Sequence, residues 1–340
     1  MRACRWWWVV FACGFALAGW AAAADPATHR GYEYYRIGDT QAARPGQTAP
    51  ALMLMGGGSW VDPAFHWFVA QAGHGHVVIL RASGADEMQD ELYRRIGGVA
   101  SVQTLVFHDR AAASDPAVLD IVRHADGIFI AGGDQANYVC FWKGTPLNEL
   151  MDRHVREGKP IGGTSAGLAI LGGYAYGALD GGSIVSPEAT HDPLGSAVTL
   201  VDGFLHVPWL AQVITDTHFA ARGRLGRLIA FVARLRHEGH AQVVGLGVDE
   251  ATVLAIGGDG IGRIFTRDHG FAWLVQPEGT PQRIAPGQPL EYRDVRLTGI
   301  GPDSRIDMRD LGVQRPAFQV TADVRDGRLV VHGDLPTEDR

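Results

Sequence analysis

Short, wholly apolar runs alternate with longer amphipathic segments along the first half of the chain. Residues 51–55 are apolar at every position and are followed by three glycines, which is typical of a buried strand that ends in a turn. Further strands are predicted at 77–80, 102–107, 127–131 and 160–162, and helices at 63–72, 86–97, 116–125, 146–157 and 166–171. Strands that alternate with helices predict a mostly parallel sheet flanked by helices, an α/β fold.

The pattern changes after residue 240, where short apolar runs are separated by glycines and charges. These runs lie at 243–248, 252–256, 263–266, 271–275, 292–298, 318–324 and 329–332. They predict antiparallel strands, and nothing between them resembles an interdomain linker. We therefore expect an α/β domain over residues 50–275 and a β-rich C-terminal extension over 276–340, packed on that domain.

The first 24 residues have the pattern of a secretory signal peptide. A basic stretch, Met1–Arg5, precedes an apolar run over 6–17, and Ala22-Ala23-Ala24 before Asp25 fits a cleavage site. The apolar run is short for a membrane span of roughly 20 residues, which favours cleavage over a retained anchor. We expect a secreted or periplasmic protein without membrane association after cleavage. Residues 25–49 are polar and mixed, and are expected to form a loosely attached N-terminal arm.

Charge and cysteine content narrow the classes of partner. Acidic side chains outnumber basic ones, 37 to 30, and the formal net charge is −7. This balance argues against nucleic acid and suits a cationic substrate. Cys140 is the one cysteine outside the predicted signal peptide, so no internal disulfide is expected. The sequence does not determine the oligomeric state and leaves a homodimer open.

The first candidate for chemistry is Ser165, in the turn Gly163-Thr164-Ser165-Ala166-Gly167. The turn fits G-x-S-x-G between a strand and a helix, where a serine nucleophile is held on a sharp bend. The free N–H of Ala166, at the start of the helix, can stabilise a developing oxyanion. The alternative is a glycine-rich connection without chemistry.

A serine nucleophile needs a base and an orienting acid. Residues 213–219 form an apolar run with a polar end, which predicts His218 at the same sheet edge as Ser165. Between Ser165 and His218 the acidic choices are Asp180, Glu188, Asp192 and Asp202. Glu188 follows a run at 182–187 that resembles a short strand, so it is our first choice. Asp180 is the second.

Two further segments offer substrate contacts. Gly132-Gly133-Asp134-Gln135 closes the fourth strand, and it lacks the spacing of a nucleotide-binding loop. The Gly133 N–H can then serve as a second oxyanion donor, with Asp134 and Gln135 available to substrate. After His218, Arg224 and Arg227 lie near one helical face. They can either bind substrate carboxylates or form internal ion pairs.

A metal site is not expected. His74-Gly75-His76 has a suggestive spacing, but no cysteine or carboxylate cluster completes a ligand set. The predicted chemistry also calls for no cofactor.

Taken together, these segments resemble the cyanophycinase branch of the S51 serine peptidases and, more distantly, the α-aspartyl dipeptidase of the same clan. They occur in the family's order and span most of residues 50–260. The matching stretches are Gly132-Gly133-Asp134-Gln135, Gly162-Gly163-Thr164-Ser165-Ala166-Gly167, Asp216-Thr217-His218-Phe219, Arg222-Gly223-Arg224-Leu225-Gly226-Arg227 and Val248-Asp249-Glu250-Ala251-Thr252.

The resemblance implies a class I glutamine amidotransferase-like, or flavodoxin-like, fold with serine in place of the usual cysteine. It implies a triad of Ser165, His218 and Glu188. The oxyanion donors that it implies are Gly133 and Ala166, and the implied substrate contacts are Gln135, Asp216, Arg222, Arg224 and Arg227. Thr217 departs from the family, because cyanophycinases have glutamine at this position. Thr217 is therefore a candidate substrate contact, and the departure leaves the acyl-transfer chemistry unaffected.

The expected function is therefore that of an exported serine peptidase with a Ser-His-Glu triad. Its expected substrate is cyanophycin, an aspartate backbone carrying arginine, cut to β-aspartyl-arginine. Three alternatives are a peptidase for small aspartyl or isoaspartyl peptides, an esterase of the α/β-hydrolase type, and a non-catalytic binding protein that retains the pocket.

Overall fold

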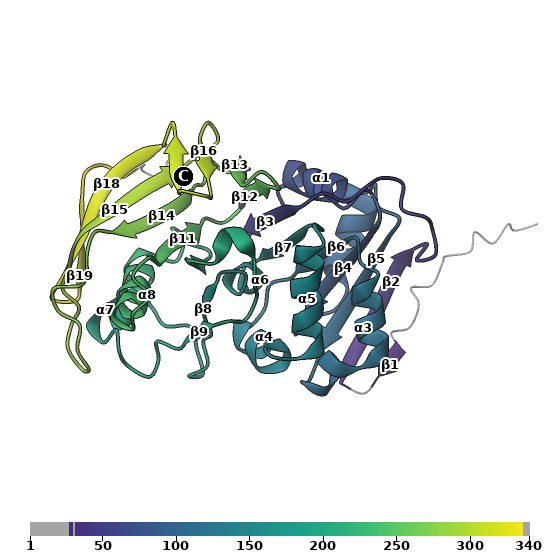
Figure 1. Ribbon diagram of the computed structural model, residues 1–340, viewed down its shortest axis with the longest axis horizontal. Helices are drawn as coiled ribbons and strands as arrows, with labels where there is room; N and C mark the ends of the chain where they lie inside the picture. Colours follow the sequence, from purple (N-terminus) through teal and green to yellow (C-terminus); the bar gives the residue numbers. More distant parts are fainter. Residues whose placement is uncertain (1–26, 30, 336–340) are drawn as a thin grey trace, which may run out of the picture.

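The computed structural model describes residues 27–29 and 31–335, which form two mixed sheets with helices packed against them (Figure 1). The 11-stranded sheet contains, in spatial order, β1 (Ala27–His29), β2 (Tyr32–Gly38), β5 (Ser101–Phe107), β4 (His76–Arg81), β6 (Gly127–Ile130), β7 (Ile161–Thr164), β3 (Ala51–Met55), β12 (Thr252–Gly257), β13 (Ile261–Thr266), β16 (Arg305–Asp307) and β17 (Gly312–Gln314). The 8-stranded sheet contains β19 (Arg328–His332), β18 (Phe318–Arg325), β15 (Tyr292–Ile300), β14 (Ala272–Pro277), β11 (Val244–Val248), β10 (Val213–Asp216), β8 (Tyr174–Tyr176) and β9 (Leu200–Asp202).

The helices connect and cover these strands. They are α1 (Asp62–Gln71), α2 (Glu87–Asp90), the π-helical η1 (Glu91–Ile96), the 3-10 turn η2 (Ala111–Ser114), α3 (Pro116–Arg123), α4 (Gln135–Trp142), α5 (Pro146–Arg156), α6 (Ala166–Ala169), α7 (Ser186–His191), the 3-10 turn η3 (Pro208–Leu210) and α8 (Leu225–His237). The helix predicted at 86–97 is thus divided into α2 and η1. The helix predicted at 166–171 is the short α6.

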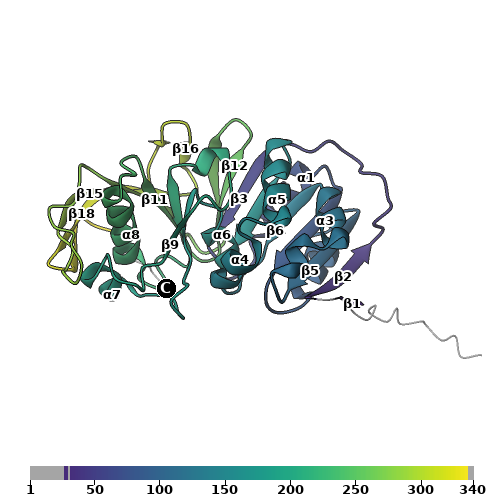
Figure 2. The ribbon, with the colours of Figure 1, turned by 60° about the horizontal axis from the view of Figure 1, so that its bottom comes forward.

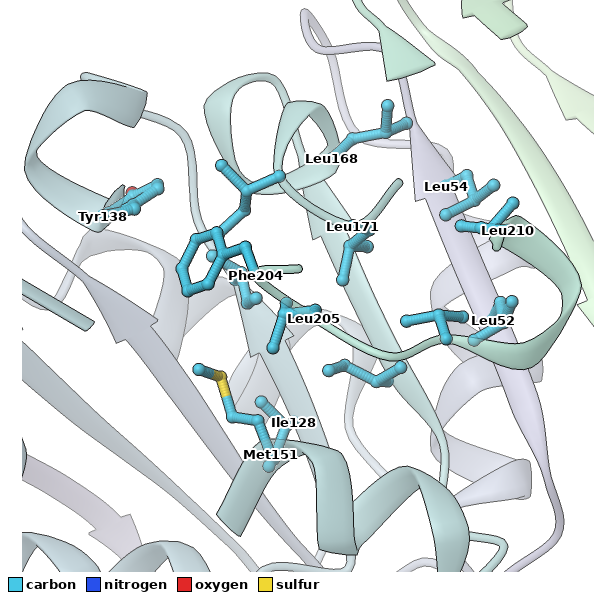
Figure 3. Close-up of a cluster of buried hydrophobic side chains, with 14 of the residues drawn as sticks. Leu52, Leu54, Ile128, Tyr138, Met151, Leu168, Leu171, Phe204, Leu205 and Leu210 are labelled. Carbon is cyan, nitrogen blue, oxygen red and sulfur yellow. The ribbon is translucent and has the colours of Figure 1, made fainter. Parts of the chain in front are cut away.

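The centre of the larger sheet is parallel, as the alternating pattern predicts. Strands β5, β4, β6, β7 and β3 pair in that order, all in parallel. Leu52 and Leu54 of β3 face the core that includes α3, α4 and α5, whereas Met53 and Met55 face the core that includes α1 and η1. Figure 3 shows part of the first core, and Figure 2 shows the helices α3 and α5 over the sheet. The predicted fold class, a mostly parallel sheet flanked by helices, is confirmed.

The predicted β-rich C-terminal region is present, but the expected boundary at residue 275 does not separate it from the rest of the fold. Strand β14 crosses the expected boundary at residue 275 and pairs with both β11 and β15. Strands β16 and β17 join the larger sheet instead of the smaller one. The β-rich C-terminal region is therefore present, but its strands continue both sheets of the α/β fold, and α8 packs against the smaller sheet.

The predicted loose arm is wrong over residues 32–38. Residues 32–38 form β2, which pairs antiparallel with β5 along its whole length. Tyr32 is fully buried, lies opposite Phe107 of β5 in the sheet, and belongs to the same hydrophobic core. The tyrosine-rich composition of this strand is a β signal that the polar residues around it obscured.

The predicted signal peptide, residues 1–24, lies outside the described residues. Among residues 27–29 and 31–335, no helix has the length and apolar character needed to cross a membrane. Within the same ranges, Cys140 is a free, exposed cysteine.

We expect His154 to make the fold sensitive to acid. It lies in α5 at 3% exposure, and its Nε2 is 2.9 Å from the carbonyl oxygen of Pro160. Burial lowers its pKa to about 4 from 6.5. The unfolded chain therefore binds this proton at a higher pH than the folded chain does. We expect this group to lower the free energy of unfolding by about 2 to 3 kcal/mol between pH 7.5 and pH 4.5.

Denaturant unfolding at the two pH values measures this loss. His154→Gln can keep the contact with the Pro160 carbonyl but cannot titrate. Its free energy of unfolding should therefore fall about 2 to 3 kcal/mol less than that of the wild type between the two pH values. His124→Gln is the matched control, since His124 is 70% exposed. The same pH dependence in the wild type and in His154→Gln would contradict this account.

Candidate active site

The candidate site lies where the two sheets adjoin, near the middle of the molecule in Figure 1. Ser165 follows β7 of the larger sheet, and His218 follows β10 of the smaller one. The Ser165 Oγ is 2.7 Å from the His218 Nε2. Strand ends from both sheets therefore place a hydroxyl and an imidazole in hydrogen-bonding contact.

Ser165 occupies a strained turn that only its glycine neighbours permit. Its φ of 52° and ψ of −122° are far from the usual regions for a side-chain-bearing residue. A Cβ on Gly163 would lie 2.6 Å from the Gly167 carbonyl carbon, and one on Gly167 would lie 2.1 Å from the Ile130 oxygen. The backbones can approach this closely because both positions are glycine, and the bend then presents the serine hydroxyl beyond the end of β7.

His218 also has a positive φ, 46°, and is held by the end of β3. Its N–H donates to the carbonyl of Gly56 at 2.7 Å. Gly57 lies against the imidazole, where an added Cβ would be 2.3 Å from the ring carbon Cε1. The glycine turn after β3 therefore makes the space that the imidazole occupies.

The acidic partner of His218 is Glu250, so the prediction of Glu188 is wrong. The His218 Nδ1 is 2.5 Å from the Glu250 Oε1. Because a carboxylate only accepts hydrogen bonds, the Nδ1 carries the proton and the Nε2 is left to accept from the Ser165 hydroxyl. Glu188 instead lies exposed in the first turn of α7. The second choice, Asp180, is also exposed and contacts Ser196 instead, at 3.4 Å.

The reason for the error is local. The segment before Glu188 resembled a strand, but Ser186 and Pro187 begin the helix α7, and proline is favoured at the start of a helix. Glu250 had a usable signal, because it closely follows the apolar run of β11. Since β11 is parallel to β10, its end lies at the same edge as His218. The prediction placed the acid between Ser165 and His218, whereas the order along the chain is Ser, His, Glu.

Asp249 supports the turn that carries Glu250. Its carboxylate accepts from the backbone N–H of Ala220 at 3.0 Å and of Phe271 at 2.9 Å. It also accepts from the indole N–H of Trp273 at 3.0 Å. The turn is further held by the Ala251 N–H, which donates to the Gly57 carbonyl at 2.8 Å. One buried carboxylate therefore ties the segment after His218 to the β11–β12 turn and to the start of β14.

The predicted oxyanion donors lie on either side of the serine turn. Ala166 begins α6, so its N–H has no acceptor within that helix. Gly133 follows β6, and a Cβ on the preceding Gly132 would lie 3.3 Å from the Ser165 Cβ. In the described part of the chain, no backbone acceptor is found for the N–H of either Gly133 or Ala166. Both donors remain open to an incoming group.

Asp216, Arg224 and Arg227 form a buried ion-pair network, which is one of the two predicted roles for these arginines. The Arg227 Nε and Nη2 donate to the two Asp216 carboxylate oxygens at 2.7 and 2.5 Å. The Arg224 Nη1 donates to the Thr217 carbonyl at 2.7 Å and to its hydroxyl at 3.0 Å. Burial lowers the pKa of Arg224 to about 10. The network fixes Asp216 and Thr217, the two residues directly before His218. A contact of the network side chains with substrate stays a prediction.

Asp134, Gln135 and Arg222 lie nearer the surface. The Asp134 carboxylate caps α4 by accepting from the Ala136 N–H at 2.9 Å. Gln135 is half-buried at the start of α4, and Arg222 is exposed. Their roles toward a substrate stay predictions.

The environment of His218 keeps its imidazole neutral. Burial lowers its pKa, the hydrogen bond to Glu250 opposes this effect, and the positive charge of Arg222 lowers the pKa further. The net direction is below the ordinary value, so the Nε2 is free to accept a proton at neutral pH.

Comparison with known proteins adds an independent observation. Residues 86–264, which include Ser165, His218 and Glu250, match the model of peptidase family S51. The cyanophycinases of Synechococcus elongatus and Thermosynechococcus vestitus are each 32% identical over 245 residues, 70% of this chain and 70% of the relative. The solved structure of a peptidase from an acI-B1 Actinobacterium is 15% identical and covers 84% of this chain and 98% of that chain, with a TM-score of 0.45. This last likeness is too distant to inform the site.

Proposed function

This chain belongs to peptidase family S51 and is a serine-type hydrolase of peptide bonds, and we propose that Ser165, His218 and Glu250 are its catalytic triad. The observation that supports the proposal most is the continuous line of contacts from hydroxyl to imidazole to carboxylate, at 2.7 and 2.5 Å. These are the separations that proton transfer from a nucleophile to an oriented base requires.

The proposed reaction proceeds in two steps. The His218 Nε2 takes the proton from the Ser165 Oγ as the oxygen attacks the substrate carbonyl. The N–H groups of Gly133 and Ala166 then stabilise the oxyanion. His218 returns the proton to the amine as the C–N bond breaks, which leaves an acyl-serine. Water, deprotonated by His218, attacks the ester, and the second breakdown releases the acid and restores the hydroxyl.

For the substrate we propose cyanophycin, cut to β-aspartyl-arginine. The curated relatives carry the name cyanophycinase, and the excess of 37 acidic over 30 basic side chains suits an arginine-rich polymer. Thr217, the departure from the family, is buried and its hydroxyl accepts from Arg224. Its side chain therefore belongs to the internal network and adds no obstruction at the surface of the site.

Digestion of cyanophycin tests this substrate directly. The purified protein is incubated with insoluble cyanophycin, and soluble β-aspartyl-arginine is measured by mass spectrometry, beside a Ser165→Ala control. Small α- and β-aspartyl dipeptides and a nitrophenyl ester are assayed in parallel. Turnover of the dipeptides alone would show that small aspartyl or isoaspartyl peptides are the substrates instead of cyanophycin. Turnover of the ester alone would favour an esterase, and failure of Ser165 to react with a fluorophosphonate would favour a binding protein.

We also propose that the protein is exported. The support is the order of segments over residues 1–24, in which a basic stretch is followed by an apolar run and then by small residues. Expression of the full chain in a Gram-negative host should yield a periplasmic product whose N-terminus lies near Asp25. A cytoplasmic product that retains residues 1–24 would contradict export.

The pH profile should report the titration of His218. Because burial lowers its pKa, kcat/KM is expected to rise with pH along an acid limb whose midpoint lies below 6.5. The protonated imidazole cannot take the serine proton, so activity is lost below that midpoint. Glu250 raises this pKa, so Glu250→Gln should move the midpoint to lower pH. An acid limb with a midpoint above 6.5 in the wild type would contradict the environment described for His218.

A further inference from the structure

We infer that Tyr138 is a positioning residue for the oxyanion site, because its hydroxyl holds the Gly132–Gly133 peptide in the orientation that turns the Gly133 N–H toward Ser165. The inference rests on the proposed triad. It adds a residue from a helix to a site whose other members follow the ends of strands. Tyr138 lies in α4, and its hydroxyl is 2.9 Å from the Ala131 carbonyl oxygen and 3.0 Å from that of Gly132.

The orientation of this peptide follows from its neighbours. A Cβ on Gly132 would lie 3.3 Å from the Ser165 Cβ, whereas a Cβ on Gly133 would lie 3.2 Å from the Tyr138 hydroxyl. The Gly132 end of this peptide is therefore near Ser165, and the Gly133 end is near the Tyr138 hydroxyl. In a trans peptide the N–H is on the side of the preceding Cα and the carbonyl is on the side of the following one. No peptide in the described chain is cis, so the Gly133 N–H is directed opposite to the Gly132 carbonyl that Tyr138 binds, and we infer that it faces the side on which Gly132 approaches Ser165.

The peptide needs an external hold. It is flanked by two glycines, and Gly133 has a φ of 153°, so the backbone itself supplies little resistance to a rotation that would turn the N–H away. The bond from Tyr138 to the Gly132 carbonyl opposes that rotation. Its donor belongs to a fully buried side chain and the bond itself is partly shielded from water, which strengthens a hydrogen bond relative to one at the surface.

Tyr138 is itself fixed in place. Its ring is fully buried and stacks on Trp142 with ring centroids 4.4 Å apart, inside the core drawn in Figure 3. Burial raises the pKa of its hydroxyl well above the usual value, so the group stays protonated and remains a donor. A rigid ring therefore presents a permanent donor to the peptide that supplies one of the two oxyanion N–H groups.

Tyr138→Phe tests the role, because it removes the hydroxyl and keeps the ring. We expect kcat for the substrate that the wild type cleaves to fall about 10- to 100-fold, with KM unchanged within about twofold. Affinity for an aspartyl-peptide aldehyde, which forms a tetrahedral adduct with serine, should fall by the same factor. Affinity for the non-covalent hydrolysis product should not change. Replacement of Tyr138 by 4-aminophenylalanine, which keeps a donor at that place, should restore most of kcat.

Tyr292→Phe is the matched control. Tyr292 is as buried as Tyr138, and its hydroxyl donates to the Gly279 carbonyl at 3.0 Å in the smaller sheet. Its loss should cost stability, measured as the unfolding temperature, and leave kcat unchanged. An unchanged kcat in Tyr138→Phe, or an equal loss of kcat in Tyr292→Phe, would overturn the inference.

The triad and the positioning role can fail separately. If Ser165→Ala keeps wild-type activity, the proposed function fails and the inference fails with it. If Ser165→Ala is inactive while Tyr138→Phe behaves like the wild type, the triad stands and only the inference about Tyr138 is wrong.

Discussion

Replacement of Ser165 by alanine is expected to lower kcat for peptide hydrolysis by about 10⁴-fold or more. Alanine cannot form the acyl intermediate, and the His218 imidazole then has no hydroxyl to activate. The oxyanion N–H groups remain, so a residual rate above that in water is expected. The fold should be unaffected, since the hydroxyl has one recorded partner among the described residues, the Nε2 of His218.

Single-turnover kinetics with the purified variant, together with fluorophosphonate labelling, measures this loss. Ser196→Ala is the control, because Ser196 is exposed and its hydroxyl contacts only Asp180, at 3.4 Å, among the described residues. That variant should keep activity within about twofold, in line with a surface change. Wild-type turnover by Ser165→Ala, with an unfolding temperature like that of the wild type, would remove Ser165 from the mechanism.

Replacement of Glu250 by glutamine is expected to lower kcat by about 10³- to 10⁴-fold. The amide keeps the size of the side chain but removes the charge that stabilises the imidazolium. Its NH₂ group can also donate to the Nδ1, which favours the tautomer with a proton on the Nε2. That tautomer cannot take the proton of Ser165. KM should change little, because the His218–Glu250 contact lies behind the imidazole and away from the serine.

Glu188→Gln is the decisive comparison. Glu188 is exposed in α7 and has no side-chain contact with His218, so its loss should leave kcat within about twofold. Both variants are made in the full chain and compared at a pH above the acid limb of the wild type. A larger loss in Glu188→Gln than in Glu250→Gln would show that the carboxylate beside His218 is not the one that orients it.

The position of Glu250 also gives the C-terminal strands a role in the site. β11, which precedes Glu250, is paired with β10 on one side and with β14 on the other. Trp273 of β14 donates to Asp249, the residue before Glu250. The smaller sheet therefore holds the histidine and the acid in register, while the larger sheet carries the serine.

Much of this arrangement follows from the sequence alone. Wholly apolar runs that alternate with helical segments require strands buried on both faces, and this predicts the parallel centre of the larger sheet. Glycines around Ser165 mark a bend too tight for side chains. The run before His218 marks a strand end, so serine and histidine are predicted at one edge. Each of these signals lies within a few residues of the feature that it predicts.

Only the tertiary structure decided which carboxylate meets His218 and what the arginines do. Strand pairing is non-local. Glu250 reaches the Nδ1 of His218 because β11 lies beside β10, and residues 244–250 by themselves do not determine which strand pairs with β11. The same holds for β2, which is a strand because β5 offers it an open edge. Arg224 and Arg227 turn inward because Asp216 is buried between them. The sequence shows the groups, and the strand pairing and helix packing within each sheet select their partners.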